Sequence, residues 1–339
     1  MKTYRLGVAC MVHDHVWGEM AHWSKLPNVE IVVAGDANQE LRDRIQAEYG
    51  VPRVYASWQE MLEKEELDIV QAASENARAA DIVEACAARG IHVVSEKPMS
   101  ARLSQADRMV KAAEAAGIKL MVNWPTAWSP TIQMMTKLIE DGAIGALFYL
   151  KYRAAHNGPK EIGCSEYFWK WLYDEALNGA GALMDYCCYS AVLNSYFLGL
   201  PRKCVGIRGT LVKDYPIPDD NAMILMHYDH AFGVAEACWT QKVHTWEPNP
   251  LAYGTEGSVG IHGGKVILHQ VGKDAREIAP EPMPAGFSNG PEHLIDCIGT
   301  GAEIRGTCNM HVSRNAQEIL EAGLLSADCG EAVAIPVVA

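Results

Sequence analysis

The chain has 339 residues, more than one hydrophobic core usually organises, so we expect two domains. Hydrophobic residues make up 49% of the chain and charged residues 21%, which is the composition of a folded globular protein rather than a disordered or fibrous one. The formal net charge of −13 argues against nucleic acid or an anionic membrane surface as a partner.

Targeting signals and cysteine spacing bear on the compartment. The N-terminus passes directly into a strand pattern, without the long apolar stretch of a signal peptide, and no segment has the length of a membrane span. Ten cysteines are scattered through both halves without a Cys-x-x-Cys pair. Free cysteines in this distribution are typical of a reducing environment, so we expect a cytoplasmic protein.

The first third of the chain alternates short apolar segments with helical patterns. Strands are predicted at residues 5–10, 29–36, 67–73, 91–95 and 118–122. This alternation predicts right-handed βαβ units and an α/β fold with a parallel, doubly wound sheet. The alternation of strands and helices ends at Asn123-Trp124-Pro125, so we predict one domain at residues 1–123 and a second at residues 124–339.

The turn after the first strand is where a dinucleotide-binding fold places its glycine-rich phosphate loop. No glycine occurs here between Gly7 and Gly18. Cys10, Val12 and His15 occupy about the positions of the three expected glycines, so the loop should be wider or the phosphates shifted. The loop therefore argues against a standard cofactor pose.

Two histidines in this turn, His13 and His15, raise the alternative of a metal site. Residues two apart in an extended turn point in opposite directions, and the sequence indicates no third ligand nearby. We therefore expect Asp14 to act as a helix N-cap and His13 to lie near the cofactor phosphates, with no metal.

The second strand ends in an acid, Asp36, some 20-odd residues after the turn. A carboxylate at this position hydrogen-bonds the adenosine ribose hydroxyls of NAD and repels the 2′-phosphate of NADP. Asp36 therefore favours NAD over NADP, while capping of the following helix is the alternative role.

Another strand end carries adjacent charges, Glu96 and Lys97, followed by Pro98, which cannot extend a strand ladder. Ligands bind outside the carboxyl ends of the strands in open α/β sheets, so Lys97 is a candidate for chemistry. The alternative is a pair of ordinary solvated loop charges.

The second half begins with Ser129-Pro130, an N-cap and first-turn proline that predict a helix to Asp141. A strand is predicted at Leu147–Ala155, and the segments 222–228, 232–239, 258–262 and 265–269 alternate without crossover helices. This pattern predicts an α+β domain with a mainly antiparallel open sheet. An uncovered sheet face needs a partner, so we expect a homo-oligomer packed sheet to sheet.

Small residues at 178–182 lead into a predicted helix that ends at Gly199. Asp185 and Tyr189 are four residues apart, so they share one face of this helix. A carboxylate and a phenol on one face can both reach a bound polyol; a structural hydrogen bond between them is the alternative.

Taken together, Glu96-Lys97-Pro98 and the Gly-x-Gly-x-x-x-Asp-x-x-x-Tyr run from Gly179 to Tyr189 resemble the Gfo/Idh/MocA oxidoreductases. This family includes glucose–fructose oxidoreductase, inositol dehydrogenase and dihydrodiol dehydrogenase. The resemblance covers nearly the whole chain and implies an N-terminal Rossmann domain with a nicotinamide cofactor over Glu96 and Lys97. It also implies a C-terminal domain whose open sheet forms the contact of a homodimer or homotetramer.

The resemblance implies a role for each matching residue. Lys97 looks like the active-site lysine, with a cis bond to Pro98, and Asp185 resembles the substrate-binding acid. Tyr189 stands where many members have a histidine, and we expect Lys97 to lower the pKa of its phenol so that the two act as an acid/base pair. Hydride would pass from the substrate carbinol to nicotinamide while Tyr189 takes the hydroxyl proton.

Further candidate residues surround this set. On the cofactor side they are Cys10, Val12, His13, Asp36, Ser74, Asn76, Glu96 and Lys97, and on the substrate side His156, Arg153 and Trp169. The arginine that the family usually has after the sixth strand is Ala127 here. Trp169 belongs to an aromatic run suited to stacking on a sugar; a helix that buries this run in the core is the alternative.

These expectations converge on an NAD-dependent dehydrogenase acting on a sugar, cyclitol or related polyol. One alternative is a redox-neutral glycosidase or lyase that oxidises its sugar only transiently. The other is a non-catalytic sensor or binding protein of the same fold, which the glycine-free loop favours.

Overall fold

Six strands near the N-terminus form one parallel sheet in the order β3-β2-β1-β4-β5-β6. The computed structural model describes residues 2–243 and 246–337. The strands are β1 (Tyr4–Ala9), β2 (Val29–Gly35), β3 (Arg53–Tyr55), β4 (Ile69–Ala72), β5 (His92–Glu96) and β6 (Leu120–Asn123). This order reverses direction between β1 and β4, which creates a ligand crevice at their carboxyl ends. The predicted doubly wound sheet is confirmed, and only the three-residue edge strand β3 was not predicted.

Helices of the first domain follow the strands as crossover connections. They are α1 (His15–Trp23), α2 (Gln39–Tyr49), α3 (Trp58–Lys64), the short 3-10 helix η1 (Asn76–Arg78), α4 (Ala79–Ala87) and α5 (Leu103–Ala116). Both α2 and α5 end at a glycine in the left-handed region, Gly50 at φ 64° and Gly117 at φ 65°. A glycine at this position ends a helix without the steric cost that a Cβ would bring.

The second sheet has nine strands in the order β14-β13-β12-β11-β7-β10-β9-β8-β15. They are β7 (Leu147–Ala155), β8 (Lys203–Gly209), β9 (Asn221–His227), β10 (Phe232–Cys238), β11 (Leu251–Gly254), β12 (Gly257–His262), β13 (Lys265–Gln270), β14 (Arg276–Ile278) and β15 (Val333–Ala334). Strands β7 and β10 pair in parallel, and the other neighbours in this sheet pair antiparallel. The predicted α+β domain with a mainly antiparallel sheet is therefore confirmed.

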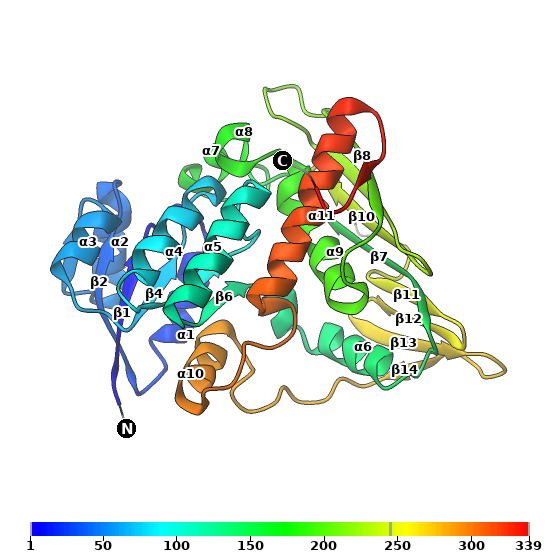
Figure 1. Ribbon diagram of the computed structural model, residues 1–339, viewed down its shortest axis with the longest axis horizontal. Helices are drawn as coiled ribbons and strands as arrows, with labels where there is room; N and C mark the ends of the chain where they lie inside the picture. Colours follow the sequence, from blue (N-terminus) through cyan, green and yellow to red (C-terminus); the bar gives the residue numbers. More distant parts are fainter. Residues whose placement is uncertain (1, 244–245, 338–339) are drawn as a thin grey trace.

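The remaining helices all follow β6 in the chain, and they pack against the C-terminal sheet, against the first domain or between the two. They are the 3-10 helices η2 (Pro125–Trp128) and η3 (Gly306–Cys308), with α6 (Pro130–Glu140), α7 (Glu166–Leu172), α8 (Glu175–Asn178), α9 (Ala182–Leu198), α10 (Gly290–Thr300) and α11 (Met310–Cys329). In Figure 1 the N-terminal sheet lies on the left, the C-terminal sheet on the right, and α9 and α11 between them. Helix α9 contacts β7, β10 and α11, and α11 also contacts α5 of the first domain.

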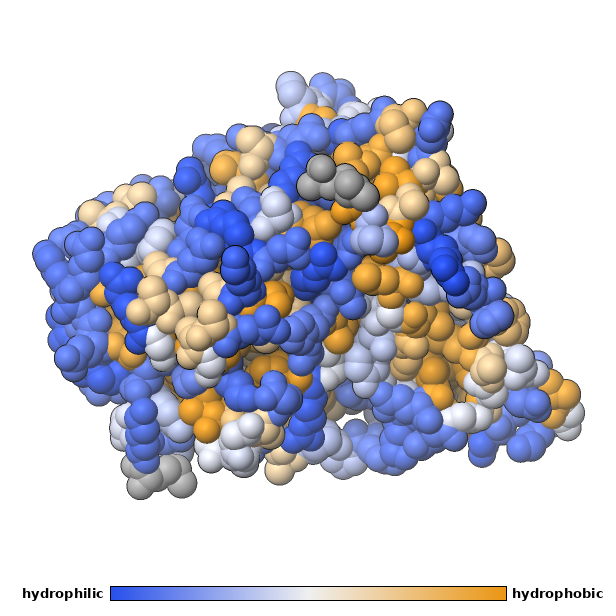
Figure 2. Space-filling view, in the orientation of Figure 1, coloured by the Kyte–Doolittle hydropathy of each residue, from blue (hydrophilic) through white to orange (hydrophobic). Residues whose placement is uncertain are grey.

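The other face of the C-terminal sheet carries exposed apolar side chains. Val205, Ile207, Leu225 and Phe232 are 43% to 63% exposed, and Val205 lies opposite Leu225 in the β8–β9 register. Figure 2 shows apolar residues gathered over the C-terminal half in that view. Among the described residues, no helix has both the length and the apolar character needed to cross a membrane.

Candidate active site

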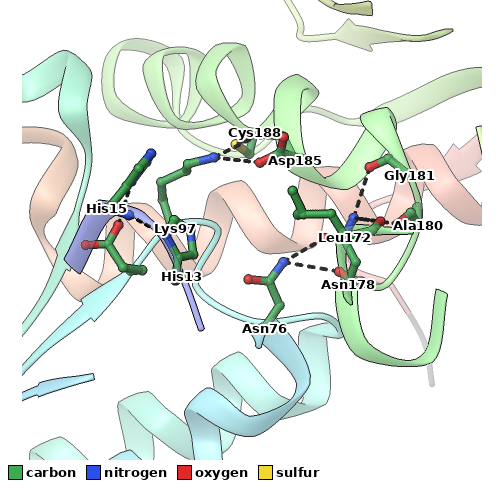
Figure 3. Close-up of polar contacts among 11 residues, drawn as sticks. His13, His15, Asn76, Lys97, Leu172, Asn178, Ala180, Gly181, Asp185 and Cys188 are labelled. Atoms are coloured by element: carbon green, nitrogen blue, oxygen red, sulfur yellow. Dashed lines mark hydrogen bonds and ion pairs between the residues drawn. The ribbon is translucent and has the colours of Figure 1, made fainter. Parts of the chain in front are cut away.

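The carboxyl ends of β1, β4 and β5 bring most of the predicted residues to the crevice of the first sheet. Strand β1 leads into residues 10–15, β4 into 73–76 and β5 into 96–98. The N-terminal end of α9 faces the same edge, because Asp185 in its first turn reaches Lys97 after β5 (Figure 3). The two halves of the sequence pattern therefore meet at one point.

Lys97 and Asp185 form a buried ion pair. The Lys97 Nζ donates to the Asp185 Oδ1 at 2.6 Å, and their side chains are 2% and 5% exposed. The Lys97–Pro98 peptide bond is cis, as expected. A buried charge pair costs desolvation free energy, and the attraction between the two charges at this short distance repays part of it. The solvated-charge alternative for Lys97 is therefore wrong.

A carboxylate outside helix α9 fixes where the helix begins. Asp219 accepts hydrogen bonds from the backbone N–H groups of Gly181 at 2.9 Å and Leu183 at 2.7 Å. A Cβ on Gly181 would come within 2.2 Å of the Asp219 carbonyl oxygen, so only glycine fits this approach. These contacts explain the glycine at position 181, and they were not evident from the sequence.

The electrostatics of Lys97 and Tyr189 differ from the expectation in one respect. Burial alone lowers the pKa of Lys97, but the charge of Asp185 and the neighbouring Tyr189 raise that pKa well above its ordinary value. Burial raises the pKa of Tyr189, and the opposing charge of Lys97 only reduces this rise. Lys97 thus lowers the pKa of Tyr189 as expected, but burial outweighs this effect, so the net shift is upward. The ammonium is bonded to Asp185 and lies 5.0 Å from the centre of the phenol ring.

Aromatic side chains line the approach to this ion pair. Tyr186 was not predicted, yet its ring centre lies 5.8 Å from the Lys97 Nζ and 5.7 Å from the ring centre of Tyr189. Its position three residues before Tyr189 is the sequence signal that could have found it. An open pocket of about 440 Å³ beside Tyr186 and Tyr189 is lined by further side chains that include Thr126, Ser129, Tyr152, Arg153 and Asn249.

The three substrate-side candidates lie at different places. The His156 ring is 4.6 Å from that of Tyr186, and burial lowers the pKa of His156 to about 4, so its imidazole is neutral. The Arg153 guanidinium is held by Glu236 at 3.2 Å and Gln241 at 3.0 Å. His156 contacts Tyr186 directly, and Arg153 lines the pocket beside Tyr186 and Tyr189.

Trp169 and the rest of the aromatic run divide between the two faces of α7. Phe168 and Trp171 are buried, as the core alternative predicted, whereas Trp169 packs against Tyr173 with ring centres 5.6 Å apart. The ammonium of Lys160 lies 5.4 Å from the centre of the Trp169 ring. The run is therefore not one continuous stacking surface.

The glycine-free loop after β1 nevertheless has the backbone conformation that glycine favours. Cys10 has φ 62°, and it is the only described residue other than glycine with a positive φ. The buried Asp36 carboxylate accepts hydrogen bonds from the backbone N–H groups of Met11 at 2.6 Å and Asn38 at 2.7 Å. A cleft of about 220 Å³ opens beside it, lined by Cys10, Asp36, Asn38, Trp58 and Arg78 among others.

Helix α7 of the second domain holds the same loop from the other side. The Asp14 carboxylate accepts from the Ser165 backbone N–H at 2.7 Å and from its Oγ at 2.5 Å. Trp171 donates its indole N–H to the Val12 carbonyl oxygen at 3.3 Å. Asp14 occupies the N-cap position of α1, but its side chain makes no cap hydrogen bond there. The predicted capping role is wrong, because this carboxylate anchors the start of α7 instead.

The two histidines of the loop lie together. The ring centres of His13 and His15 are 4.4 Å apart, and the His15 Nδ1 lies 3.0 Å from the Glu96 Oε2. We expected the two rings to point in opposite directions, and this was wrong. Asp14 between them is helical, with φ −58° and ψ −21°, so the turn is not extended.

Ser74 and Asn76, after β4, are both buried. Ser74 Oγ donates to the Glu75 carbonyl oxygen at 3.0 Å. Asn76 Nδ2 donates to the Asn178 Oδ1 at 2.8 Å, and Asn178 in turn donates to the carbonyl oxygens of Ala180 and Gly181 (Figure 3). Asn76 thus ties the first domain to the segment that precedes α9.

These residues fit a dinucleotide such as NAD. The loop has a left-handed backbone at Cys10, Asp36 presents a buried carboxylate beside a cleft, and Glu96 and Lys97 stand at the end of a neighbouring strand. In folds of this topology the adenosine ribose lies at the acid after the second strand and the pyrophosphate at the turn after the first.

Comparison with known families gives two matches. Residues 13–124 match the model described as an oxidoreductase family with an NAD-binding Rossmann fold. Residues 132–260 match the GFO/IDH/MocA C-terminal domain.

Several curated relatives carry dehydrogenase names. D-apiose dehydrogenase from Paraburkholderia graminis is 36% identical over 138 residues, which are 40% of this chain and 36% of that protein. Trans-1,2-dihydrobenzene-1,2-diol dehydrogenase from Xenopus laevis is 25% identical over 82% of this chain and 84% of that protein.

Solved structures share the fold over the full length. An oxidoreductase from Agrobacterium radiobacter in complex with NAD+, L-tartaric acid and magnesium has a TM-score of 0.81 at 20% identity and covers 99% of each chain. Levoglucosan dehydrogenase in complex with NADH and levoglucosan has a TM-score of 0.80 at 19% identity, covering 99% of this chain and 100% of that one. The two family matches, to successive segments of one chain, show that this protein belongs to the Gfo/Idh/MocA family of NAD-binding oxidoreductases.

Proposed function

We propose that the protein oxidises a carbinol of a sugar, cyclitol or related polyol with NAD as the hydride acceptor. The observation that carries this proposal is the buried Lys97–Asp185 pair beside Tyr189, at the crevice of an NAD-binding Rossmann domain. Relatives named as apiose, levoglucosan and dihydrodiol dehydrogenases support this substrate class.

The roles follow from geometry and charge. Bound NAD supplies a nicotinamide C4 that accepts hydride from the substrate carbon. Asp185 and the Lys97 ammonium orient the reacting hydroxyl, and Tyr189 takes its proton. A phenol with a raised pKa is a reluctant base, so the Lys97 charge is needed to stabilise the phenolate as the proton moves.

On the cofactor side, Asp36 binds the adenosine ribose hydroxyls and Glu96 the nicotinamide ribose. Cys10, Val12, His13, Ser74 and Asn76 shape the crevice between these two points. The acidic side chain of Asp36 favours NAD over NADP, because it would repel a 2′-phosphate.

On the substrate side, the pocket beside Tyr189 suits a polyol, because Thr126, Ser129 and Asn249 add polar groups to its aromatic walls. His156 is a neutral hydrogen-bonding group next to Tyr186. Arg153 lines this pocket and adds a charged group to it, whereas Trp169, packed against Tyr173, would contact only a longer substrate.

The exposed apolar face of β8, β9 and β10 is the proposed contact between subunits. Side chains such as Ile207, which is 63% exposed, are costly to leave in water, and a second copy of the sheet would cover them. Light scattering on the purified protein tests this: we expect a dimer or tetramer, and an Ile207→Lys variant should shift toward monomer. A cytoplasmic location stays a prediction. It is supported by the cysteines, because all ten are free, as is typical of a reducing environment.

The test of function is incubation of the protein with NAD and a panel of sugars, cyclitols and dihydrodiols, followed at 340 nm. Steady accumulation of NADH is expected with at least one polyol. Cleavage of a glycoside without NADH would indicate the redox-neutral alternative, and NAD binding without any turnover would indicate a sensor.

A further inference from the structure

Three side chains of metal-ligand type converge beside the cofactor crevice: His13 and His15 after β1, and Glu96 at the end of β5. One ligand atom from each lies within 4.8 Å of the others, and His13 and Glu96 are buried. We infer that these three residues form a binding site for a divalent transition-metal ion of the Zn²⁺ class, and that occupation of this site excludes NAD from Glu96.

The spacing suits an ion after a small movement. Ligand atoms around a tetrahedral Zn²⁺ are roughly 3.4 Å apart, given bonds of about 2.1 Å. The His15 Nδ1 and the Glu96 Oε2 are already 3.0 Å apart. The His15 side chain is 34% exposed, so it can rotate to complete the triangle and leaves a path for the ion from solvent.

His13 has a nitrogen available for this role. Its Nδ1 accepts only a long hydrogen bond, 3.3 Å from the backbone N–H of His15. Its ring packs against Phe168, with ring centres 4.4 Å apart, and this packing holds the imidazole in place.

A second buried carboxyl group, that of Glu19, lies next to Glu96, and burial together with the Glu96 charge raises the pKa of Glu19. Asn123 donates to the Glu96 Oε1 at 3.1 Å, which leaves Oε2 for the ion. The neighbouring Glu19 is 9% exposed, and its Oε2 has no hydrogen-bond partner among the described residues.

The donor set selects the kind of ion. Two imidazoles and one carboxylate favour Zn²⁺, Co²⁺ or Ni²⁺ over Mg²⁺, which prefers oxygen ligands. A second cluster on α10, His293 with Asp296 and Cys297, fits less well, because the His293 Nε2 already accepts from the Arg305 backbone N–H at 3.0 Å. That cluster would add a thiolate, which makes the two sites distinguishable.

Competition with NAD rests on the proposed role of Glu96 toward the nicotinamide ribose, whereas the metal site itself does not. One carboxylate oxygen cannot bind the ion and accept the ribose hydroxyl hydrogen bond at full strength. Metal binding is therefore measured first, on the full chain without NAD, and then again with saturating NAD.

The experiment is titration of the full-length protein with Co²⁺, followed by its visible absorption. Wild type is expected to bind one equivalent without a thiolate charge-transfer band, and Zn²⁺ should displace it. His15→Ala and Glu96→Gln should each weaken binding at least tenfold. His22→Ala, which removes a partly exposed histidine of the same helix, is the matched control and should bind like wild type.

Equal affinity in wild type and His15→Ala, or a thiolate band that Cys297→Ala abolishes, would overturn the site. Saturating NAD should raise the apparent dissociation constant for Co²⁺ at least tenfold; an unchanged constant would overturn the competition. Failure of every polyol in the NADH assay would leave the metal titration unaffected, so the two proposals fail separately.

Discussion

The ends of β5 and β1 line the same crevice, but they match the family pattern in different ways. After β5, the residues that the family pattern requires are present, and the structure joins them in the 2.6 Å contact between Lys97 and Asp185. After β1, the expected glycines are absent, yet Cys10 has the left-handed φ of 62° that such a loop uses. Side-chain chemistry is therefore kept by residue identity, whereas a backbone conformation can be kept by contacts around it.

Hydrogen bonds from both sides hold the loop after β1 in this conformation. The left-handed conformation costs a residue with a Cβ roughly 1–2 kcal/mol. Hydrogen bonds from Met11 to Asp36, from Ser165 to Asp14 and from Trp171 to the Val12 carbonyl hold the loop on both sides. At about 0.5–1.5 kcal/mol each, they are sufficient to offset that cost.

The largest effect is expected at the β5 end. Lys97→Met should abolish measurable turnover, a loss of roughly 10⁴-fold or more, because it removes the ammonium that stabilises the Tyr189 phenolate. NADH formation at 340 nm measures this. If activity stayed within tenfold of wild type, the mechanism would be wrong.

This variant also leaves Asp185 buried without its partner, which costs about 3–5 kcal/mol of stability. The double variant Lys97→Met with Asp185→Asn is the control, since it removes both charges together. We expect its midpoint in urea to recover toward that of wild type while turnover stays absent. Loss of activity is then separated from loss of folding.

Tyr189→Phe should lower turnover by roughly 10²–10³-fold and remove the pH dependence of oxidation. Burial raises the pKa of Tyr189 above its ordinary value of 10.0, so the phenolate fraction grows with pH throughout the accessible range. In wild type, kcat/KM for oxidation should therefore rise steadily between pH 6 and 10. His156, with a pKa of about 4, should add no step between pH 5 and 8.

The control for this prediction is Tyr186→Phe, which changes the neighbouring phenol 5.7 Å away. It should keep the rising pH profile, because Tyr186 is not the proton acceptor. A profile that flattened in Tyr186→Phe and persisted in Tyr189→Phe would reverse the assignment.

Sequence alone predicted the fold and the β5 end well, because both depend on regular periodicity and on residues with distinct chemistry. The alternation of strands and helices specified the first sheet, and the four-residue spacing of Asp185 and Tyr189 specified a shared helix face. Both signals are local, so no knowledge of the tertiary structure was needed.

The β1 end could not be predicted in the same way. The direction of the His13 and His15 rings depends on a helical backbone at Asp14, and Asp14 binds Ser165, which is 151 residues away in sequence. The clamp of Asp219 on the first turn of α9 is another long-range contact. Contacts between domains leave no periodic signal, so the expected cap and the opposed rings were wrong. Burial of Tyr189, which outweighs the effect of Lys97 on the phenol pKa, could not be predicted for the same reason.

A smaller effect is expected from Asp36→Ala at the β1 end. Loss of the ribose hydrogen bonds should weaken NAD binding by about 1–3 kcal/mol. The same carboxylate orders the loop through Met11 and Asn38, so part of the loss comes from the loop itself. Calorimetric titration with NAD measures the change, and Glu40→Ala, a nearby acid on α2, should bind NAD like wild type. Unchanged affinity in Asp36→Ala would remove Asp36 from the cofactor site.

The smallest effect concerns the backbone of Cys10 itself. Cys10→Ala and Cys10→Gly both remove the thiol, so the difference between them isolates the cost of a Cβ at φ 62°. The glycine variant should be more stable than the alanine variant by about 1 kcal/mol, although glycine also loses more entropy on folding. Urea unfolding of the two variants measures this difference. If alanine were as stable as glycine, the left-handed conformation would not be strained, and the loop would need no support from Asp36 and α7.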